Sequence, residues 1–255
     1  MKGIQIPFNT PNDEEFSTHQ TLRLMGLAGL VALLISIIPI INILDYPFRL
    51  LLTIVHELGH GLTAILTGGD FQNFVVFPNG SGLAYTAGGW RFLIIPAGYL
   101  SVAVFAAVLI VLGRSHRWSR IALSIIGLIM IIMSIWFGRP GELGLFAILN
   151  SLLGLVMGII FGLLFLWLAL RANFWLIIFF LHLIAIKAGF TAFSDLVALI
   201  GLTIRGGFLA QANDAQSMAE LTHIPAFIWA AAWVIIAGFI IGLAIKSAWL
   251  VKRGL

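Results

Sequence analysis

Residues 47–66 read PFRLLLTIVHELGHGLTAIL, an apolar run with two histidines and a glutamate near its middle. His56 and His60 are four residues apart, so in a helix their imidazole rings project from one face and can bind one metal ion together. Zinc suits imidazole nitrogen and keeps a coordination position open for water in catalytic sites. Glu57 follows the first histidine and is placed to take a proton from that water. The pattern therefore predicts a zinc site with His56 and His60 as metal ligands and Glu57 as the catalytic base.

The same residues have a second interpretation, a hydrogen-bonded polar cluster that holds membrane helices together. Two histidines and a carboxylate inside a membrane helix are costly, however, and ionisable groups at such depth mark functional sites by default. We therefore favour the catalytic interpretation.

The composition of the whole chain is that of a membrane protein. Hydrophobic residues make up 61% of the 255 residues and charged residues only 9%, whereas a soluble domain carries about a quarter charged residues. The net charge of +4 does not indicate a nucleic-acid partner, because the basic residues lie singly or in short groups between apolar runs, where they set membrane topology. The chain has no cysteine, which excludes disulfides and thiolate metal ligands.

The apolar runs predict an all-α polytopic membrane protein of about seven transmembrane helices, forming one domain over residues 1–255. The predicted spans are residues 22–44, 47–66, 91–112, 121–137, 145–170, 174–202 and 224–250. Residues 1–21 form a polar N-terminal segment without a cleavable signal pattern. The distribution of lysine and arginine places the C-terminus in the cytoplasm and the N-terminus outside, and we expect the protein in the cell (plasma) membrane.

A small β-hairpin is expected between the second and third spans. Two β-prone runs, residues 71–77 and 83–86, flank a Pro-Asn-Gly-Ser turn at 78–81. The strands are too short to cross a bilayer, so the hairpin should lie at the interface or against the helices. An exposed edge of this hairpin could capture an extended substrate segment by strand addition.

A catalytic zinc needs a third protein ligand, and two aspartates compete for that role. Asp195 lies inside the sixth span, where an unpaired charge is costly, so it needs a partner; that partner is zinc or, as the alternative, Lys187. Asp214 lies in the polar segment 203–222 at an expected helix start, where it could equally be a first-turn acid favoured by the helix dipole, with Asn213 as the cap. The cost of a charge in the membrane favours Asp195, and Asp214 remains its rival.

Several motifs besides the zinc pattern are similar to those of one protein family. They are HELGH at 56–60, Gly68-Gly69, Gly88-Gly89 after the hairpin, Pro96-Ala-Gly-Tyr99, and Asn213-Asp-Ala with Pro225 and Trp229, which is similar to a Ser-Asp-Ala…Pro…Trp tail with Asn in place of Ser. On these residues the chain resembles the M50 (site-2 protease) metallopeptidases, and most closely their M50B-like branch. Site-2 proteases carry the aspartate ligand in a Leu-Asp-Gly setting, whereas here the order is Ser194-Asp195-Leu196.

The resemblance implies intramembrane proteolysis, with zinc held by two histidines and an aspartate and with the glutamate as base. We thus expect a zinc metalloendopeptidase that uses Zn²⁺ and lies in the lipid bilayer, where it hydrolyses membrane-protein or peptide substrates and binds no nucleic acid. The alternative is a catalytically silent membrane protein of the same fold that binds zinc or regulates other proteins. The intact Glu57 argues against it, because a purely structural site needs no base there.

Overall fold

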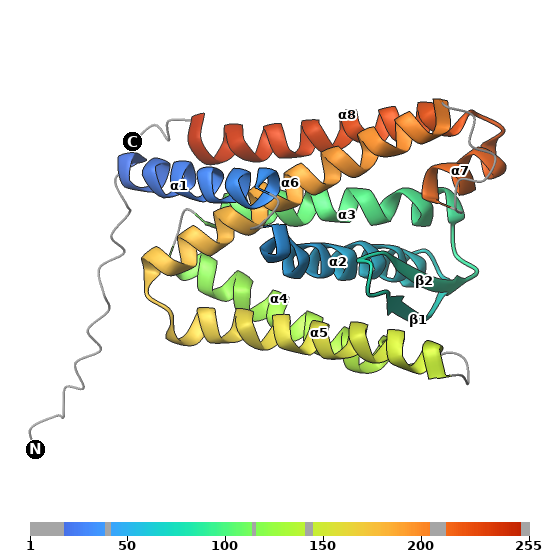
Figure 1. The fold of residues 1–255 in the computed structure, drawn as a ribbon, viewed down its shortest axis with the longest axis horizontal. Coiled ribbons are helices and arrows are strands. Elements are labelled where there is room, and N and C mark those ends of the chain that lie inside the picture. The colour runs from blue at the N-terminus through green and yellow to red at the C-terminus, as the bar shows by residue number, and fades with distance from the viewer. Residues whose placement is uncertain (1–17, 39–41, 114–115, 141–144, 205–212, 251–255) are drawn as a thin grey trace, which may run out of the picture.

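The structure is a computed structural model, and it describes residues 18–38, 42–113, 116–140, 145–204 and 213–250. Helices make up most of it, with one small antiparallel sheet beside them (Figure 1). In chain order the elements are α1 (Thr18–Ile37), the 3₁₀ turn η1 (Asn42–Leu44), α2 (Asp45–Leu66), β1 (Asp70–Val76), β2 (Gly82–Ala87), α3 (Arg91–Leu112), α4 (His116–Phe137), α5 (Leu145–Arg171), α6 (Phe174–Ile204), α7 (Asp214–Thr222), α8 (Ala226–Ile245) and the π-helical turn η2 (Lys246–Leu250).

Five helical stretches within the described residues are long and apolar enough to cross a membrane, and the expected number of seven is not confirmed. The five are Arg91–Leu112, Arg117–Phe137, Ile148–Arg171, Phe174–Ser194 and Ala226–Ala248. Within α1, the apolar stretch among the fully described residues is Arg23–Ile37, which is shorter than these five. The other predicted span, α2, carries Asp45, Arg49 and Glu57, whose charges lower its hydropathy.

The predicted hairpin is present. β1 and β2 pair in antiparallel register from Asp70 opposite Ala87 to Val76 opposite Gly82. In the turn, Gly80 has a φ of +85°, a backbone conformation that glycine adopts without steric cost. The predicted Pro-Asn-Gly-Ser turn therefore closes the sheet where the sequence indicated.

One face of α2 holds the turn of this hairpin. The side chains of Tyr46, Arg49 and Thr53 donate hydrogen bonds, in that order, to the carbonyl oxygens of residues 78–80 at 2.9, 3.2 and 2.6 Å. Residues spaced three and four apart lie on one side of a helix. The hairpin is therefore fixed along the same helix that carries the HELGH motif.

The two strands have different surroundings. β1 packs between α2 on one side and α4 and α5 on the other, and Phe71 stacks on Phe137 of α4 with ring centroids 4.3 Å apart. β2 alternates between partly buried and exposed residues along its length, and within the described residues it pairs with β1 alone. One edge of β2 is thus left without a strand partner.

A buried ion pair joins three helices beside the core. Lys187 of α6, only 3% exposed, forms an ion pair with Asp45 in the first turn of α2 and donates a hydrogen bond to the Ser36 hydroxyl of α1 at 2.8 Å. From the sequence, Lys187 is also a possible partner of Asp195. In the structure Lys187 pairs with Asp45, and the side chain of Asp195 lies outside what the structure describes.

Candidate metal centre

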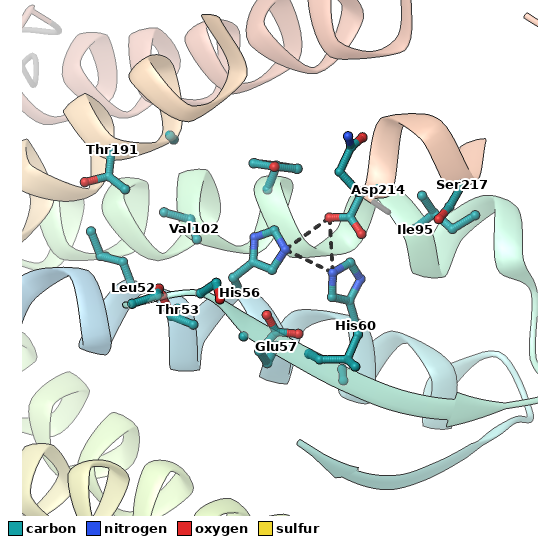
Figure 2. Close-up of a pocket in the computed structure, with 18 of the residues that line it drawn as sticks. Leu52, Thr53, His56, Glu57, His60, Ile95, Val102, Thr191, Asp214 and Ser217 are labelled. Atoms are coloured by element: carbon teal, nitrogen blue, oxygen red, sulfur yellow. Dashed lines mark hydrogen bonds and ion pairs between the residues drawn. The ribbon is translucent and has the colours of Figure 1, made fainter. Parts of the chain in front are cut away.

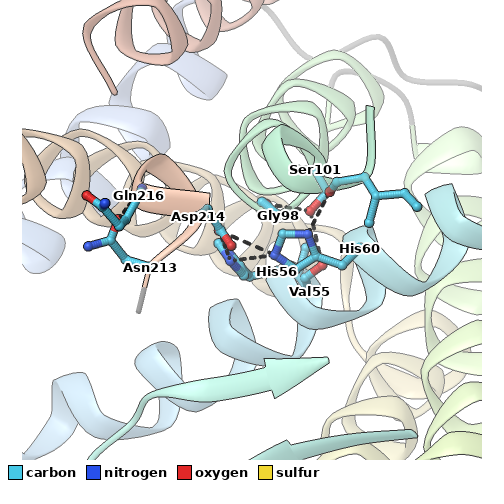
Figure 3. A network of polar contacts seen from close by, with 9 residues as sticks. Val55, His56, His60, Gly98, Ser101, Asn213, Asp214 and Gln216 are labelled. Atoms are coloured by element: carbon cyan, nitrogen blue, oxygen red, sulfur yellow. Dashed lines mark hydrogen bonds and ion pairs between the residues drawn. The ribbon is translucent and has the colours of Figure 1, made fainter. Parts of the chain in front are cut away.

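Three side chains from two helices that are distant in sequence come together at one point. His56 and His60 lie one turn apart in α2, and Asp214 is the first residue of α7 (Figure 2). Asn213 caps α7, because its side-chain oxygen accepts a hydrogen bond from the backbone N–H of Gln216 at 2.9 Å (Figure 3). This cap fixes the start of α7 and with it the position of the Asp214 carboxylate.

The donor atoms of these residues form a small triangle. Nε2 of His56 lies 3.1 Å from Nε2 of His60, and the Oδ2 atom of Asp214 lies 3.1 Å from the first nitrogen and 3.4 Å from the second. Among the described residues this is the one group of three or more potential ligands that lie close enough to share a metal ion.

The triangle fits the donor set of a zinc ion. Ligand atoms placed tetrahedrally at about 2.0–2.1 Å from zinc lie roughly 3.3 Å from one another. Two imidazole nitrogens and one carboxylate oxygen also make up the kind of three-ligand set that leaves a fourth position open for water or substrate. The residues present therefore fit a catalytic zinc site in both chemistry and spacing.

One hydrogen bond of His60 fixes which of its ring nitrogens is left to coordinate a metal ion. Nδ1 of His60 lies 2.7 Å from the carbonyl oxygen of Ile94, and a carbonyl can only accept. Nδ1 therefore carries a proton, and Nε2 is the ring nitrogen left to coordinate a metal ion. An outer hydrogen bond of this kind orients a metal-binding histidine and raises its basicity.

The charge of Asp214 also suits a cation. Burial disfavours the ionised carboxyl, but the interactions with His60 and His56 outweigh that effect and hold the pKa of Asp214 below its usual range. The side chain is accordingly a carboxylate at neutral pH.

Helix α3 closes the centre from another side. A Cβ atom at Gly98 would overlap the Nε2 atoms of both His56 and His60, so only a glycine leaves room for the two rings. Tyr99, the next residue, packs edge-to-face on His56 with ring centroids 4.7 Å apart. The Ser101 hydroxyl bonds to the carbonyl oxygens of Val55 and Gly98 at 3.1 and 2.7 Å, which joins α3 to α2 at this level (Figure 3).

Glu57 lies beside the triangle, between α2 and the hairpin. Its side chain is 5% exposed, the backbone N–H of Ala84 donates to it, and β2 approaches so closely that a Cβ atom at Gly82 would lie 2.5 Å from its Oε1 atom. A cavity of about 880 Å³ is lined by Glu57 together with all three donor residues, and Figure 2 shows the carboxyl group next to the two histidines. A carboxylate in that position can accept a proton from water held in the cavity.

Four of the five site residues named from the sequence are therefore neighbours: His56, Glu57, His60 and Asp214. Asp195 falls within α6, but its side chain lies outside what the structure describes. The capping interaction of Asn213 and the start of a helix at Asp214, both expected from the sequence, are present.

Sequence reasoning did not identify the roles of Gly98 and the Ile94 carbonyl. Gly98 lies in the Pro96-Ala-Gly-Tyr99 motif, so the motif pointed to the right place without indicating its contact with the histidines. No sequence signal exists for a backbone carbonyl such as that of Ile94.

One comparison with known proteins gives a match that covers most of the chain. The chain matches the model of the family described as Peptidase M50B-like over residues 26–244, a stretch that contains both α2 and α7. No curated protein and no solved structure matches the chain.

Proposed function

Because this chain belongs to the Peptidase M50B-like family, which implies a metalloprotease, we propose that it is a membrane-embedded zinc metalloendopeptidase. Its substrates would be membrane-associated proteins or peptides, cleaved at or within the bilayer. The observation that carries the proposal is the convergence of the His56, His60 and Asp214 donor atoms within 3.4 Å, with the Glu57 carboxyl in the same cavity.

In this proposal zinc is held by His56, His60 and Asp214. When bound, the ion acidifies a water molecule and polarises the carbonyl of the scissile peptide bond. Glu57 takes the proton from the attacking water and passes it to the leaving amine nitrogen. The Ile94 carbonyl holds His60 in the tautomer that leaves Nε2 free to coordinate.

We assign the third ligand position to Asp214 in preference to Asp195. This assignment is supported by the Asp214 carboxylate, which lies within 3.4 Å of both histidine nitrogens. The distance of Asp214 from the motif in sequence is no obstacle, because Asn213 fixes the start of α7 next to α3.

Strand addition at β2 supplies a way of presenting the substrate. A membrane helix hides its amide groups in internal hydrogen bonds, so it must unwind before a peptide bond can be attacked. An extended segment that pairs with the free edge of β2 would lie next to Glu57, since Gly82 and Ala84 both contact that side chain.

The five apolar helices and the family together indicate an integral membrane protein. We further propose that α1 and α2 complete seven spans of a single domain. The C-terminus would then be cytoplasmic and the protein would reside in the cell membrane.

Zinc stoichiometry on detergent-purified protein tests the metal site. We expect one zinc per chain in the wild type and in Asp195→Ala, and loss of zinc in His56→Ala and in Asp214→Ala. Zinc lost in Asp195→Ala and kept in Asp214→Ala would reverse the ligand assignment, and a wild type that takes up no added zinc would refute the protease proposal.

Cleavage of a peptide mixture tests catalysis separately. Glu57→Gln keeps all three donors, so it should retain zinc and lose cleavage. If the zinc-loaded wild type is as inactive as Glu57→Gln, the chain is the zinc-binding, catalytically silent protein instead.

A further inference from the structure

Arg49 lies where two cavities meet. It lines the cavity of the metal centre and also a second cavity of about 470 Å³ between α1, α2 and α6. Thr191 of α6 is shared by the two cavities as well. The second cavity combines hydroxyl groups, those of Ser36 and Ser194, with apolar side chains such as Phe190. It therefore has the composition of a pocket for a side chain with a polar end.

The charges around this junction do not cancel. In the second cavity Lys187 is neutralised by Asp45, and within the part of the chain that the structure describes no carboxylate forms an ion pair with Arg49. In the first cavity a bound divalent cation would be balanced by Asp214 and Glu57, and a second arginine, Arg91, also lines that cavity. Among the described residues no carboxylate offsets the charge of Arg49, and this positive charge can attract an anion.

The guanidinium of Arg49 has more N–H donors than its hydrogen bond to the hairpin turn uses. One N–H, on Nη2, bonds to the carbonyl oxygen of Asn79 at 3.2 Å. A guanidinium carries five N–H groups in a planar arrangement that matches a carboxylate. Arg49 can thus hold the hairpin turn and still bind a carboxylate through two of its remaining donors.

The position of Arg49 along α2 determines how far it lies from the metal centre, where the scissile peptide bond of a substrate would be held. It precedes His56 by seven residues, which is about 10.5 Å along a helix. An extended peptide advances about 3.3 Å per residue, so this distance corresponds to about three residues of substrate. We propose that Arg49 is a specificity-determining residue that binds an aspartate or glutamate side chain about three residues from the scissile bond, on one fixed side of it. The inference rests on the proposed proteolytic function and deepens it.

Digestion of a proteome-derived peptide library in neutral detergent, with cleavage sites read by mass spectrometry, tests this inference. For the wild type, acidic residues should be enriched several-fold at one position two to four residues from the cleaved bond. Arg49→Gln should lose the enrichment, Arg49→Lys should keep part of it, and Arg49→Glu should favour basic residues at that position.

Two controls separate charge from structure. Tyr46→Phe removes a hydrogen bond to the same hairpin turn without altering charge, and it should leave the acidic preference intact. Arg139→Gln removes an arginine that lines neither cavity and should also have no effect. If Tyr46→Phe abolishes the preference as Arg49→Gln does, Arg49 acts only by positioning the turn.

Other outcomes overturn the inference in distinguishable ways. Cleavage by the wild type without an acidic preference refutes the specificity of Arg49 and leaves the proteolytic function standing. No cleavage by zinc-loaded wild type refutes the proteolytic function and this inference with it. If added phosphatidylglycerol accelerates wild-type cleavage, and Arg49→Gln removes that acceleration without changing residue preference, Arg49 binds a lipid phosphate instead of a substrate carboxylate.

Discussion

Gly98 of α3 faces His56 of α2 so closely that a Cβ atom on the glycine would overlap the Nε2 atom of the imidazole. The same Cβ atom would overlap Nε2 of His60. A helix that contributes no ligand thus determines whether the two ligand rings have room to converge.

Gly98→Ala should accordingly weaken zinc binding. The added methyl group must displace at least one imidazole, and disturbing the outer contacts of a metal site costs about 10- to 100-fold in affinity. Competition with a chromophoric zinc chelator measures the change. Gly238→Ala on α8 is the matched control, because a Cβ atom there meets nothing within 4 Å. Equal zinc affinity in Gly98→Ala and the wild type would show that the rings can shift at no cost.

The ease of predicting this site differed among its residues for a physical reason. His56, Glu57 and His60 belong to one helical turn, so periodicity alone places them together. Asp214 is 158 residues from His56, and no local pattern gives the distance between two helices that far apart in sequence. The cost of a charge in the membrane favours Asp195 as the ligand. That argument says nothing about Asp214, because it lies in a polar segment at the capped start of α7.

The same limit explains what was missed in the fold. Hydropathy located the five long apolar helices, and turn residues located the hairpin. The pairing of Lys187 with Asp45 depends on the relative heights of α6 and α2, which hydropathy does not encode. The roles of Tyr46, Arg49 and Thr53 as donors to one turn likewise need the hairpin to be in place.

Thr53→Val should lower cleavage without loss of zinc. Thr53 donates a 2.6 Å hydrogen bond to the Gly80 carbonyl, one turn from Glu57, and a typical hydrogen bond contributes about 1 kcal/mol. A loosened turn would move β2 relative to Glu57 and reduce kcat/KM by roughly fivefold on that energy. Thr53→Ser keeps the hydroxyl and should cleave nearly as well as the wild type. A valine variant with unchanged kcat/KM would show that the other two donors hold the turn unaided.

Lys187→Met should destabilise the protein strongly. It leaves the Asp45 carboxylate uncompensated beside α6, and removing one partner of a buried pair costs about 3–5 kcal/mol. Asp45→Asn should be similarly harmful, whereas the double variant should lose less than the sum of the two. Thermal unfolding in detergent measures all three, with the exposed Lys246→Met as control. Simple additivity of the single variants would show that the pair contributes no coupling energy.

Thr86→Pro should reduce cleavage while zinc binding and the hairpin persist. The Ala84 N–H faces Glu57, and backbone N–H groups in a strand point to the same edge at every second residue. The N–H of Thr86 should therefore lie on the free edge of β2, available to a substrate strand, and proline removes it without breaking a bond to β1. Cleavage of the peptide mixture by Thr86→Pro, compared with Thr86→Val, isolates the N–H from the side chain. Undiminished cleavage in Thr86→Pro would mean that substrates do not pair with β2 at this position. The same result at every free-edge residue of β2 would exclude strand addition as the way in which substrates bind.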